Sequence, residues 1–278
     1  MYEAEINRKN QTAFVFLVDQ SGSMDLPFGG TPGKKKKDGV ADALNRLLQT
    51  LVFRCAKGDV IHDRYYIGVI GYGDSVGSGW GGALAGQTLV PVSQMANNPL
   101  RIETRTRKAD DGAGGLVEET IRFPVWFEAV AKGRTKMCEA LRLACGAVED
   151  FVKNCPTCFP PIVINISDGA ATDGDPEPEA AALRAIASQD GNVLLFNIHI
   201  SSLNERPIQF PISDALLPSD DYAQRLYRMS SPLPSVLIEQ AQATEIDIRD
   251  GARGFVFNGD LVSVIQFLDI GTRVQTAY

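Results

Sequence analysis

Short apolar runs alternate along this chain with longer segments in which apolar residues recur every three or four positions. Continuous β-branched runs are typical of buried parallel strands. They occur at residues 14–18, 65–72, 162–167 and 193–200. Helical spacing occurs at residues 35–55, 135–153, 176–188, 221–229 and 235–243. Strands that alternate with helices predict an α/β fold, in which a Rossmann-like, doubly wound and mostly parallel sheet carries helices on both faces.

One segment interrupts this alternation. Polar and apolar residues alternate over 102–107 and again near 119–123, and a Gly-rich stretch at 109–115 separates them. This pattern predicts a β-hairpin arm. We therefore expect a single domain over residues 1–278 with an insertion at about 97–127. Three further elements are expected: a short edge strand at 89–92, a last strand at 254–257 and a closing helix at 260–268.

Composition narrows the classes of protein that this chain can belong to. Its 278 residues are 44% hydrophobic, which is enough to bury a large core. No stretch has the length and apolarity of a membrane span, and the first seven residues lack the apolar core of a signal peptide. The net charge of −7 argues against a nucleic-acid partner. We expect a cytoplasmic protein that binds neither membrane nor nucleic acid.

Five cysteines are present, and two of them form a C-x-x-C pair, Cys155 and Cys158, in the turn before a predicted core strand. Such a pair can be a redox couple, half of a zinc site or two reduced thiols. The last interpretation is favoured, because no second C-x-x-C and no H-x₃-H partner exists. Reduced thiols also fit a cytosolic setting.

The strongest chemical signal is a set of oxygen donors on three predicted loops. Asp19, Ser21 and Ser23 directly follow the first strand, and Asp168 follows the strand at 162–167. Thr135 opens a predicted helix after a polar turn. In open α/β sheets, ligands bind at the carboxyl ends of the strands. If the two strands are neighbours, these donors meet at one edge, and such a set suits a hard cation such as Mg²⁺.

These motifs resemble the von Willebrand factor A (vWA) domain. The pattern D-x-S-x-S, a threonine in a G-x-T-x-M turn and D-G after V-I-N-I-S correspond to its metal-ion-dependent adhesion site (MIDAS). All five positions of that site are present: Asp19, Ser21, Ser23, Thr135 and Asp168. Residues 128–141 are similar to bacterial cytosolic vWA proteins of tellurite-resistance-type gene neighbourhoods, and the resemblance extends over about 13–270. It implies a vWA fold and a bound Mg²⁺ or Mn²⁺.

The donor types favour recognition over catalysis. Hydroxyl ligands are neutral, so they leave most of the charge of a divalent ion uncompensated, and the ion can accept a carboxylate from a partner. We therefore expect a non-enzymatic module that binds an acidic side chain of another protein. The resemblance further implies a scaffold in a bacterial stress-response or conflict system, beside a kinase, a phosphatase or an AAA+ ATPase.

Two other functions stay open at this point. A metal-dependent phosphohydrolase would use Asp19 as its nucleophile, but a haloacid-dehalogenase-like enzyme needs an aspartate where this chain has Ser21. A scaffold with a vestigial metal site is the other. The serines and Asp168 could also be ordinary helix caps, although caps do not explain the alternate spacing after Asp19.

Three further groups receive structural interpretations. The lysines at 34–37 are expected to form a solvated helix start, or a rim that attracts acidic partners. The acids at 173, 175, 177 and 179 could form a second metal site, but acids in a solvated loop at a helix start are the favoured interpretation. His199 ends a predicted strand and could border the site, but a packed strand histidine is the favoured interpretation.

Overall fold

The computed structural model describes residues 2–4, 6–28, 33–110, 115–201, 205–242 and 247–258. Its main strands are β1 (Thr12–Asp19), β4 (Tyr65–Tyr72), β9 (Ile162–Ser167), β10 (Leu194–His199) and β12 (Phe255–Phe257). Short strands are β2 (Ala56–Lys57), β3 (Val60–Ile61), β5 (Val76–Ser78), β6 (Val90–Pro91) and β11 (Ile208–Gln209). The helices are α1 (Lys36–Cys55), α2 (Val92–Asn97), α3 (Met137–Asn154), α4 (Glu177–Ala185), α5 (Asp221–Met229) and α6 (Ser235–Gln242). Short 3₁₀ turns are η1 (Gly22–Asp25), η2 (Gly82–Leu84) and η3 (Asp214–Leu216).

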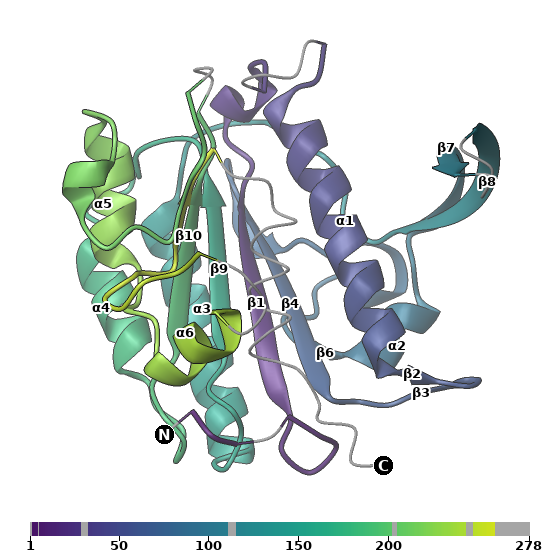
Figure 1. Cartoon of the computed structure of the whole chain (residues 1–278), viewed down its shortest axis with the longest axis horizontal. Coiled ribbons are helices and arrows are strands. Elements are labelled where there is room, and N and C mark those ends of the chain that lie inside the picture. Colours follow the sequence, from purple (N-terminus) through teal and green to yellow (C-terminus); the bar gives the residue numbers. More distant parts are fainter. Residues whose placement is uncertain are drawn as a thin grey trace.

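An eight-stranded sheet forms the centre of the molecule (Figure 1). Its order is β11-β12-β10-β9-β1-β4-β5, and β6 also pairs with β4. The five main strands pair in parallel, while β11, β5 and β6 add antiparallel edges. The predicted doubly wound, mostly parallel α/β fold is confirmed. The strands β1 and β9 are neighbours, which meets the condition under which the predicted oxygen donors come to one edge of the sheet.

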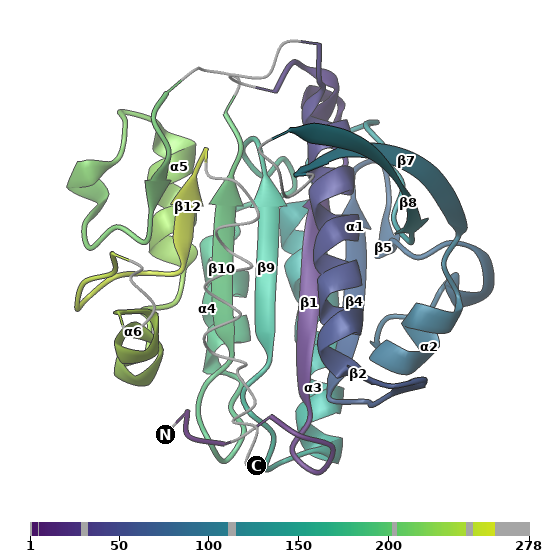
Figure 2. The ribbon, with the colours of Figure 1, turned by 45° about the vertical axis from the view of Figure 1, so that its right-hand side comes forward.

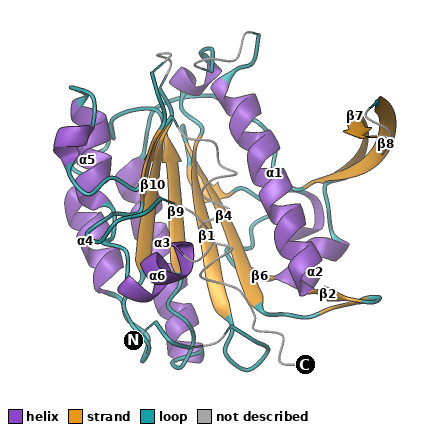
Figure 3. Cartoon of the chain, in the orientation of Figure 1, coloured by secondary structure: helices purple, strands orange, loops and turns teal. Residues whose placement is uncertain are grey.

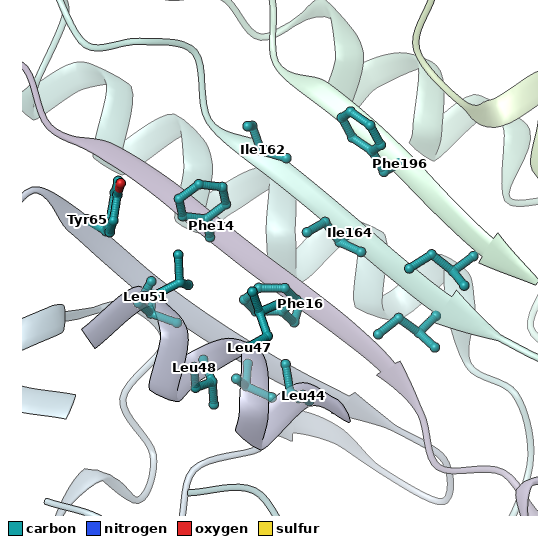
Figure 4. Packing of buried hydrophobic residues seen from close by; sticks show 14 of the residues in the cluster. Phe14, Phe16, Leu44, Leu47, Leu48, Leu51, Tyr65, Ile162, Ile164 and Phe196 are labelled. Carbon is teal, nitrogen blue, oxygen red and sulfur yellow. The ribbon is translucent and has the colours of Figure 1, made fainter. Parts of the chain in front are cut away.

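Helices cover both faces of the sheet (Figure 3). Because side chains alternate along a strand, β1 contributes Phe14 and Phe16 to the core beneath α1, α2 and α6, and Val15 and Leu17 to the core beneath α3, α4 and α5. Figure 4 shows the two phenylalanines among the leucines of α1, namely Leu44, Leu47, Leu48 and Leu51. Each such buried side chain contributes about 1.5–3 kcal/mol of transfer free energy. The packing on both faces fixes the direction of β1 and hence the place where it ends.

A buried chain of polar side chains crosses the sheet near the carboxyl ends of its strands. The hydroxyl of Tyr72 on β4 donates to Asn165 Oδ1 on β9 at 2.7 Å. Asn165 Nδ2 donates to Asn197 Oδ1 on β10 at 2.9 Å, and Asn197 Nδ2 donates to Ser230 Oγ at 3.0 Å. All four residues are fully buried. A satisfied network of this kind fixes the register of neighbouring strands.

The predicted hairpin arm is confirmed as β7 (Arg101–Asp110) and β8 (Leu116–Val125), which form a two-stranded sheet of their own. Figures 1 and 2 show the arm leaving the main body beside α1. Its base is buried at Phe123 and Val125. Arg105 lies over the Phe123 ring, 3.5 Å from its centroid, and forms an ion pair with Asp42 of α1. The arm is therefore fixed to α1 near its base.

The structure differs from the sequence-based expectations at several boundaries. The edge strand expected at 89–92 is only Val90–Pro91, because α2 begins directly after Pro91. The small β2–β3 hairpin was not predicted, since two-residue strands have no periodicity to detect. The helix expected at 260–268 lies outside the described residues. Within the described part of the chain, no helix has a stretch apolar and long enough to cross a membrane.

We predict that Asn165→Ala lowers the free energy of unfolding by about 3 kcal/mol, because it leaves the Tyr72 hydroxyl and the Asn197 amide without their buried partner. Urea denaturation followed by circular dichroism measures this change. Asn154→Ala is the matched control, because the Asn154 side chain is exposed at the end of α3, and its effect should stay within about 0.5 kcal/mol. Equal effects of the two changes would contradict a stabilising role for the network.

Candidate functional site

The candidate site lies where β1 and β9 end, at the upper end of the sheet in Figure 1. Val18 and Ile166 are paired in the parallel register of these two strands. Asp19 is the last residue of β1, and Asp168 directly follows β9. Strand pairing in the core therefore brings two carboxylates, 149 positions apart in sequence, to the same edge of the sheet.

Hydrogen bonds join four of the five predicted residues into one continuous set. The backbone N–H of Ser21 donates to Asp19 Oδ1 at 2.8 Å. The hydroxyl oxygens of Ser21 and Ser23 are 3.0 Å apart, and Ser23 Oγ donates to Asp168 Oδ1 at 2.7 Å. Ser167, which the sequence motifs did not single out, donates its hydroxyl to Asp19 Oδ2 at 2.7 Å. Both carboxylates are thereby held in fixed orientations beside the two serines.

The turn that carries Thr135 is attached to the D-x-S-x-S loop through the backbone. The N–H of Gly22 donates to the carbonyl of Gly133 at 3.1 Å, and the N–H of Lys132 donates to the carbonyl of Gln20 at 2.6 Å. Thr135 is buried, with 6% of its surface exposed. The structure thus places the fifth predicted residue on a loop joined directly to the loop of the serines.

Gly133 is required by the geometry of this turn. Its φ is +85°, a left-handed conformation that favours glycine. A Cβ atom at this position would lie 2.2 Å from Oδ1 of Asp74 and 2.6 Å from the Asp74 backbone nitrogen. Only a residue without a side chain lets the turn pack against the β4–β5 loop.

The loop after β9 holds the Thr135 turn from the other side. Thr172 donates its backbone N–H to the carbonyl of Thr135 at 2.8 Å, and its hydroxyl accepts from the Thr135 N–H at 3.1 Å. Asp173 accepts from the backbone N–H groups of Cys138 and Glu139 at 3.2 and 2.9 Å. Asp173 was expected at the start of its own helix, but it caps α3 instead. Hydrogen bonds therefore connect all three loops of the predicted site.

Lys36 corrects the expectation of a solvated lysine cluster. Its side chain is 3% exposed, and its Nζ lies 2.8 Å from Oδ2 of Asp168, whose side chain is fully buried. The neighbouring Lys35 and Lys37 behave as expected, since both pair with the exposed Asp25 at 2.8 and 2.6 Å. The dipole of a helix disfavours positive charges at its start, so lysines at this position indicate that carboxylates lie nearby. The sequence did not show which of the lysines pairs with a buried carboxylate.

Burial dominates the electrostatics of Asp19. It raises the pKa of this carboxyl to about 6, even though hydrogen bonds from Ser21 and Ser167 act in the opposite direction. No described lysine or arginine side chain pairs with Asp19. An additional positive charge at this point would compensate a carboxylate that the fold has removed from water.

Three oxygens of the donor set have a spacing compatible with a hard divalent cation. Adjacent ligands of an octahedral Mg²⁺ lie about 2.9 Å apart, given metal–oxygen distances of roughly 2.1 Å. The oxygen pairs Ser21–Ser23 and Ser23–Asp168 are separated by 3.0 and 2.7 Å. Among the described residues, no group of three or more His, Cys, Asp or Glu side chains could hold a metal. Any cation held here would depend on hydroxyl oxygens together with the two carboxylates.

The remaining candidates are His199 and the C-x-x-C pair. His199 is buried, and its Nε2 lies 3.2 Å from Oδ2 of Asp220, the N-cap of α5, as a packed strand histidine should. Cys155 and Cys158 are both free thiols. Burial raises the pKa of Cys158 to about 11, so this thiol stays protonated at neutral pH.

Comparisons with known proteins show similarity in structure only. No protein-family model and no curated protein matches the sequence. The vWF domain of the type V pili tip protein Mfa5 from Porphyromonas gingivalis matches with 12% identity and a TM-score of 0.32, over 59% of this chain and 39% of that one. The PilB minor pilin from Streptococcus sanguinis matches with 12% identity and a TM-score of 0.48, over 95% of this chain and 61% of that one. This chain thus spans less than two thirds of either structure.

We predict that Asp220→Ala lowers the free energy of unfolding by about 1 kcal/mol at pH 7, because α5 loses its N-cap. The hydrogen bond from His199 and those from the Tyr222 and Ala223 amides depress the pKa of Asp220 to about 2. Since the pKa in the unfolded chain is about 3.9, this contribution is complete above about pH 4. It is lost as the pH falls toward 2.

Urea denaturation of both proteins at pH 7, 4, 3 and 2 measures this difference. Asp221→Ala is the control, because it removes an exposed acid from the first turn of the same helix without removing the cap. A gap between wild type and Asp220→Ala that persists undiminished at pH 2 would contradict the assignment.

Proposed function

We propose that Asp19, Ser21, Ser23, Thr135 and Asp168 bind one Mg²⁺ or Mn²⁺ ion, and that the protein uses this ion to bind an acidic side chain of a partner protein. The observation that carries the proposal is the continuous hydrogen-bonded set of Asp19, Ser21, Ser23 and Asp168 at the ends of two adjacent parallel strands. The resemblance to the vWA family gives these same five positions to a single metal ion.

Each residue of the set has a defined part in such a site. Ser21 and Ser23 would offer hydroxyl lone pairs, and Thr135 would offer a third from the tied turn. Asp19 and Asp168 would supply negative charge, directly or through water, from orientations already fixed by Ser167 and Lys36. When bound, the ion would supply a Lewis-acidic position that a partner carboxylate can occupy.

Binding is favoured over hydrolysis by the surroundings of the two acids. Asp19 accepts hydrogen bonds on both oxygens, and Asp168 is engaged by Ser23 on one oxygen and Lys36 on the other. A carboxylate held in this way is a poor nucleophile, because attack would require it to give up these contacts. Ser21 also stands where a phosphohydrolase of the haloacid-dehalogenase type needs its second aspartate. We therefore propose that the protein is not an enzyme.

The hairpin arm and α1 together form a surface that could select the partner. A cleft between the arm and α1 is lined by Lys34, Asp38, Asp42, Arg101 and Arg105. It reaches the first turn of α1, and Lys34 stands two positions before Lys36 of the buried ion pair. Arginine and aromatic side chains are frequent anchors of protein interfaces. We propose that a partner engages the ion and this cleft together.

The cellular role rests on the family resemblance alone. We propose a cytoplasmic scaffold in a bacterial stress-response or conflict system, beside a kinase, a phosphatase or an AAA+ ATPase. Neither membrane nor nucleic acid is proposed as a partner, given the net charge of −7.

We predict that the wild-type protein binds one Mn²⁺ per chain in isothermal titration calorimetry, and that Asp19→Ala abolishes this binding. Thr135→Ala should weaken it at least tenfold, because it removes a ligand but leaves the backbone ties of the turn in place. Thr157→Ala is a matched control at an exposed threonine remote from the loops. Circular dichroism establishes that each variant is folded. Absence of Mn²⁺ binding by folded wild type would refute the proposal, and so would unchanged binding by Asp19→Ala.

We predict that the arm contributes to partner selection and not to the metal site. Peptides are selected by display against the wild-type protein in Mg²⁺ and eluted with EDTA. They should contain a glutamate or aspartate whose change to the amide abolishes binding. Replacing residues 104–122 with a four-residue Gly/Ser turn keeps the buried base of the arm, since Glu103 pairs with Phe123. This variant should bind Mn²⁺ as wild type does, but bind the peptides at least about tenfold more weakly.

Two outcomes would contradict the prediction about the arm and the acidic peptides. If the shortened arm leaves peptide affinity unchanged, the arm takes no part in recognition. If the selected peptides bind equally well after amide replacement of their acids, the ion does not receive a carboxylate.

A further inference from the structure

Lys36 occupies a position that its local surroundings do not favour. It is the first residue of α1, where the helix dipole repels a positive charge, and its side chain is 3% exposed. A lone buried ammonium is costly, and only a well-placed counter-charge offsets that cost. Asp168 is that counter-charge, at 2.8 Å. Among the lysines at 34–37, Lys36 is the one that the fold directs into the candidate site.

The backbone holds Lys36 in this place. Its N–H donates to the carbonyl of Leu26 at 3.0 Å, and the N–H of Phe28 donates to the carbonyl of Lys34 at 2.8 Å. These bonds join the start of α1 to the segment that follows the two serines. The position of the ammonium is therefore set by the same loop that carries Ser21 and Ser23.

The two oxygens of Asp168 have different partners. Oδ1 accepts from Ser23, on the side of the serine hydroxyls, while Oδ2 accepts from Lys36. The ammonium thus lies on the oxygen that does not contact the serine, so it leaves the donor set intact. With Asp19 and Asp168 ionised, the site carries two negative charges, and Lys36 reduces the sum to one.

We propose that Lys36 is a built-in counter-cation that sets the divalent-ion affinity of the site. It holds Asp168 in place in the metal-free protein, and it weakens the binding of a divalent ion by repelling it across the same carboxylate. This inference rests on the proposed function, because it assumes that a divalent ion binds beside Asp168. Its consequence is a site that binds and releases its ion more readily than two unshielded carboxylates would.

A purely structural lysine would behave differently from a counter-cation. If Lys36 only anchors α1, its loss destabilises the protein by the same amount with and without metal. If Lys36 is a counter-cation, its loss exposes Asp168 to repulsion from Asp19 in the metal-free protein, and a divalent ion removes that repulsion. The two roles are therefore separated by the effect of metal on stability.

The test compares Lys36→Met and Lys36→Gln with wild type and with Lys37→Met. Lys37→Met is the control, because it removes one positive charge from the adjacent residue, which pairs with the exposed Asp25. Isothermal titration calorimetry with Mn²⁺ measures affinity, and thermal unfolding is recorded in EDTA and in Mn²⁺. Even at the dielectric constant of water, a unit charge across one carboxylate from a divalent ion changes its affinity by about tenfold.

Both Lys36 variants should bind Mn²⁺ at least about tenfold more tightly than wild type and Lys37→Met. Their melting temperature should fall in EDTA, and Mn²⁺ should raise it by more than it raises that of wild type. Unchanged or weaker Mn²⁺ binding by folded Lys36 variants would overturn the inference and leave the proposed function standing. Absence of Mn²⁺ binding by every protein, wild type included, would instead refute the proposed function.

A measurement on wild type keeps the inference testable if both Lys36 variants fail to fold. The side-chain ¹⁵N signal of a buried, hydrogen-bonded lysine ammonium can be followed by NMR while Mg²⁺ is added. The Lys36 signal should shift as the ion binds, whereas the Lys37 signal should not. A Lys36 signal that is unchanged at saturating Mg²⁺ would contradict the proposal.

Discussion

The burial of two carboxylates side by side is the constraint on which the rest of this structure depends. Parallel pairing of β1 and β9 brings Asp19 and Asp168 to one edge of the sheet, and packing on both faces removes them from water. Each buried carboxylate then needs hydrogen bonds or a positive charge to offset its loss of hydration. Ser167 and the Ser21 amide supply this compensation for Asp19, while Ser23 and Lys36 supply it for Asp168. In the proposed site, a divalent ion held by the same oxygens would add the positive charge that Asp19 lacks.

Most of the fold could be predicted from sequence, because its main elements are long and strongly periodic. The strand Tyr65–Tyr72, the strand Ile162–Ser167 and the helix Asp221–Met229 lie where the pattern of apolar residues predicts them. The arm was predicted too, since alternation on both sides of a Gly-rich turn is typical of a β-hairpin. Short elements such as β2, β3 and β11 were missed, because two residues carry no period.

The residues of the candidate site could be predicted from the sequence. The residues that hydrogen-bond to them and hold them in place could not. Spacing and resemblance predicted that Asp19, Ser21, Ser23 and Asp168 lie together, and hydrogen bonds connect them. The partners that hold them were not found. Lys36 looked like its solvated neighbours, and Asp173 looked like an acid at the start of its own helix. Only the three-dimensional structure shows that Lys36 pairs with Asp168 and that Asp173 caps α3. Both contacts join residues that are far apart in sequence.

The most direct test of the proposed metal site is a crystal structure of the protein grown in MnCl₂, with anomalous diffraction recorded at the manganese edge. We expect one anomalous peak per chain, bonded to the hydroxyl oxygens of Ser21, Ser23 and Thr135 and within one water layer of Asp19 and Asp168. A peak bonded to other residues would contradict it. So would the absence of any peak at these five residues at a manganese concentration that saturates binding in solution.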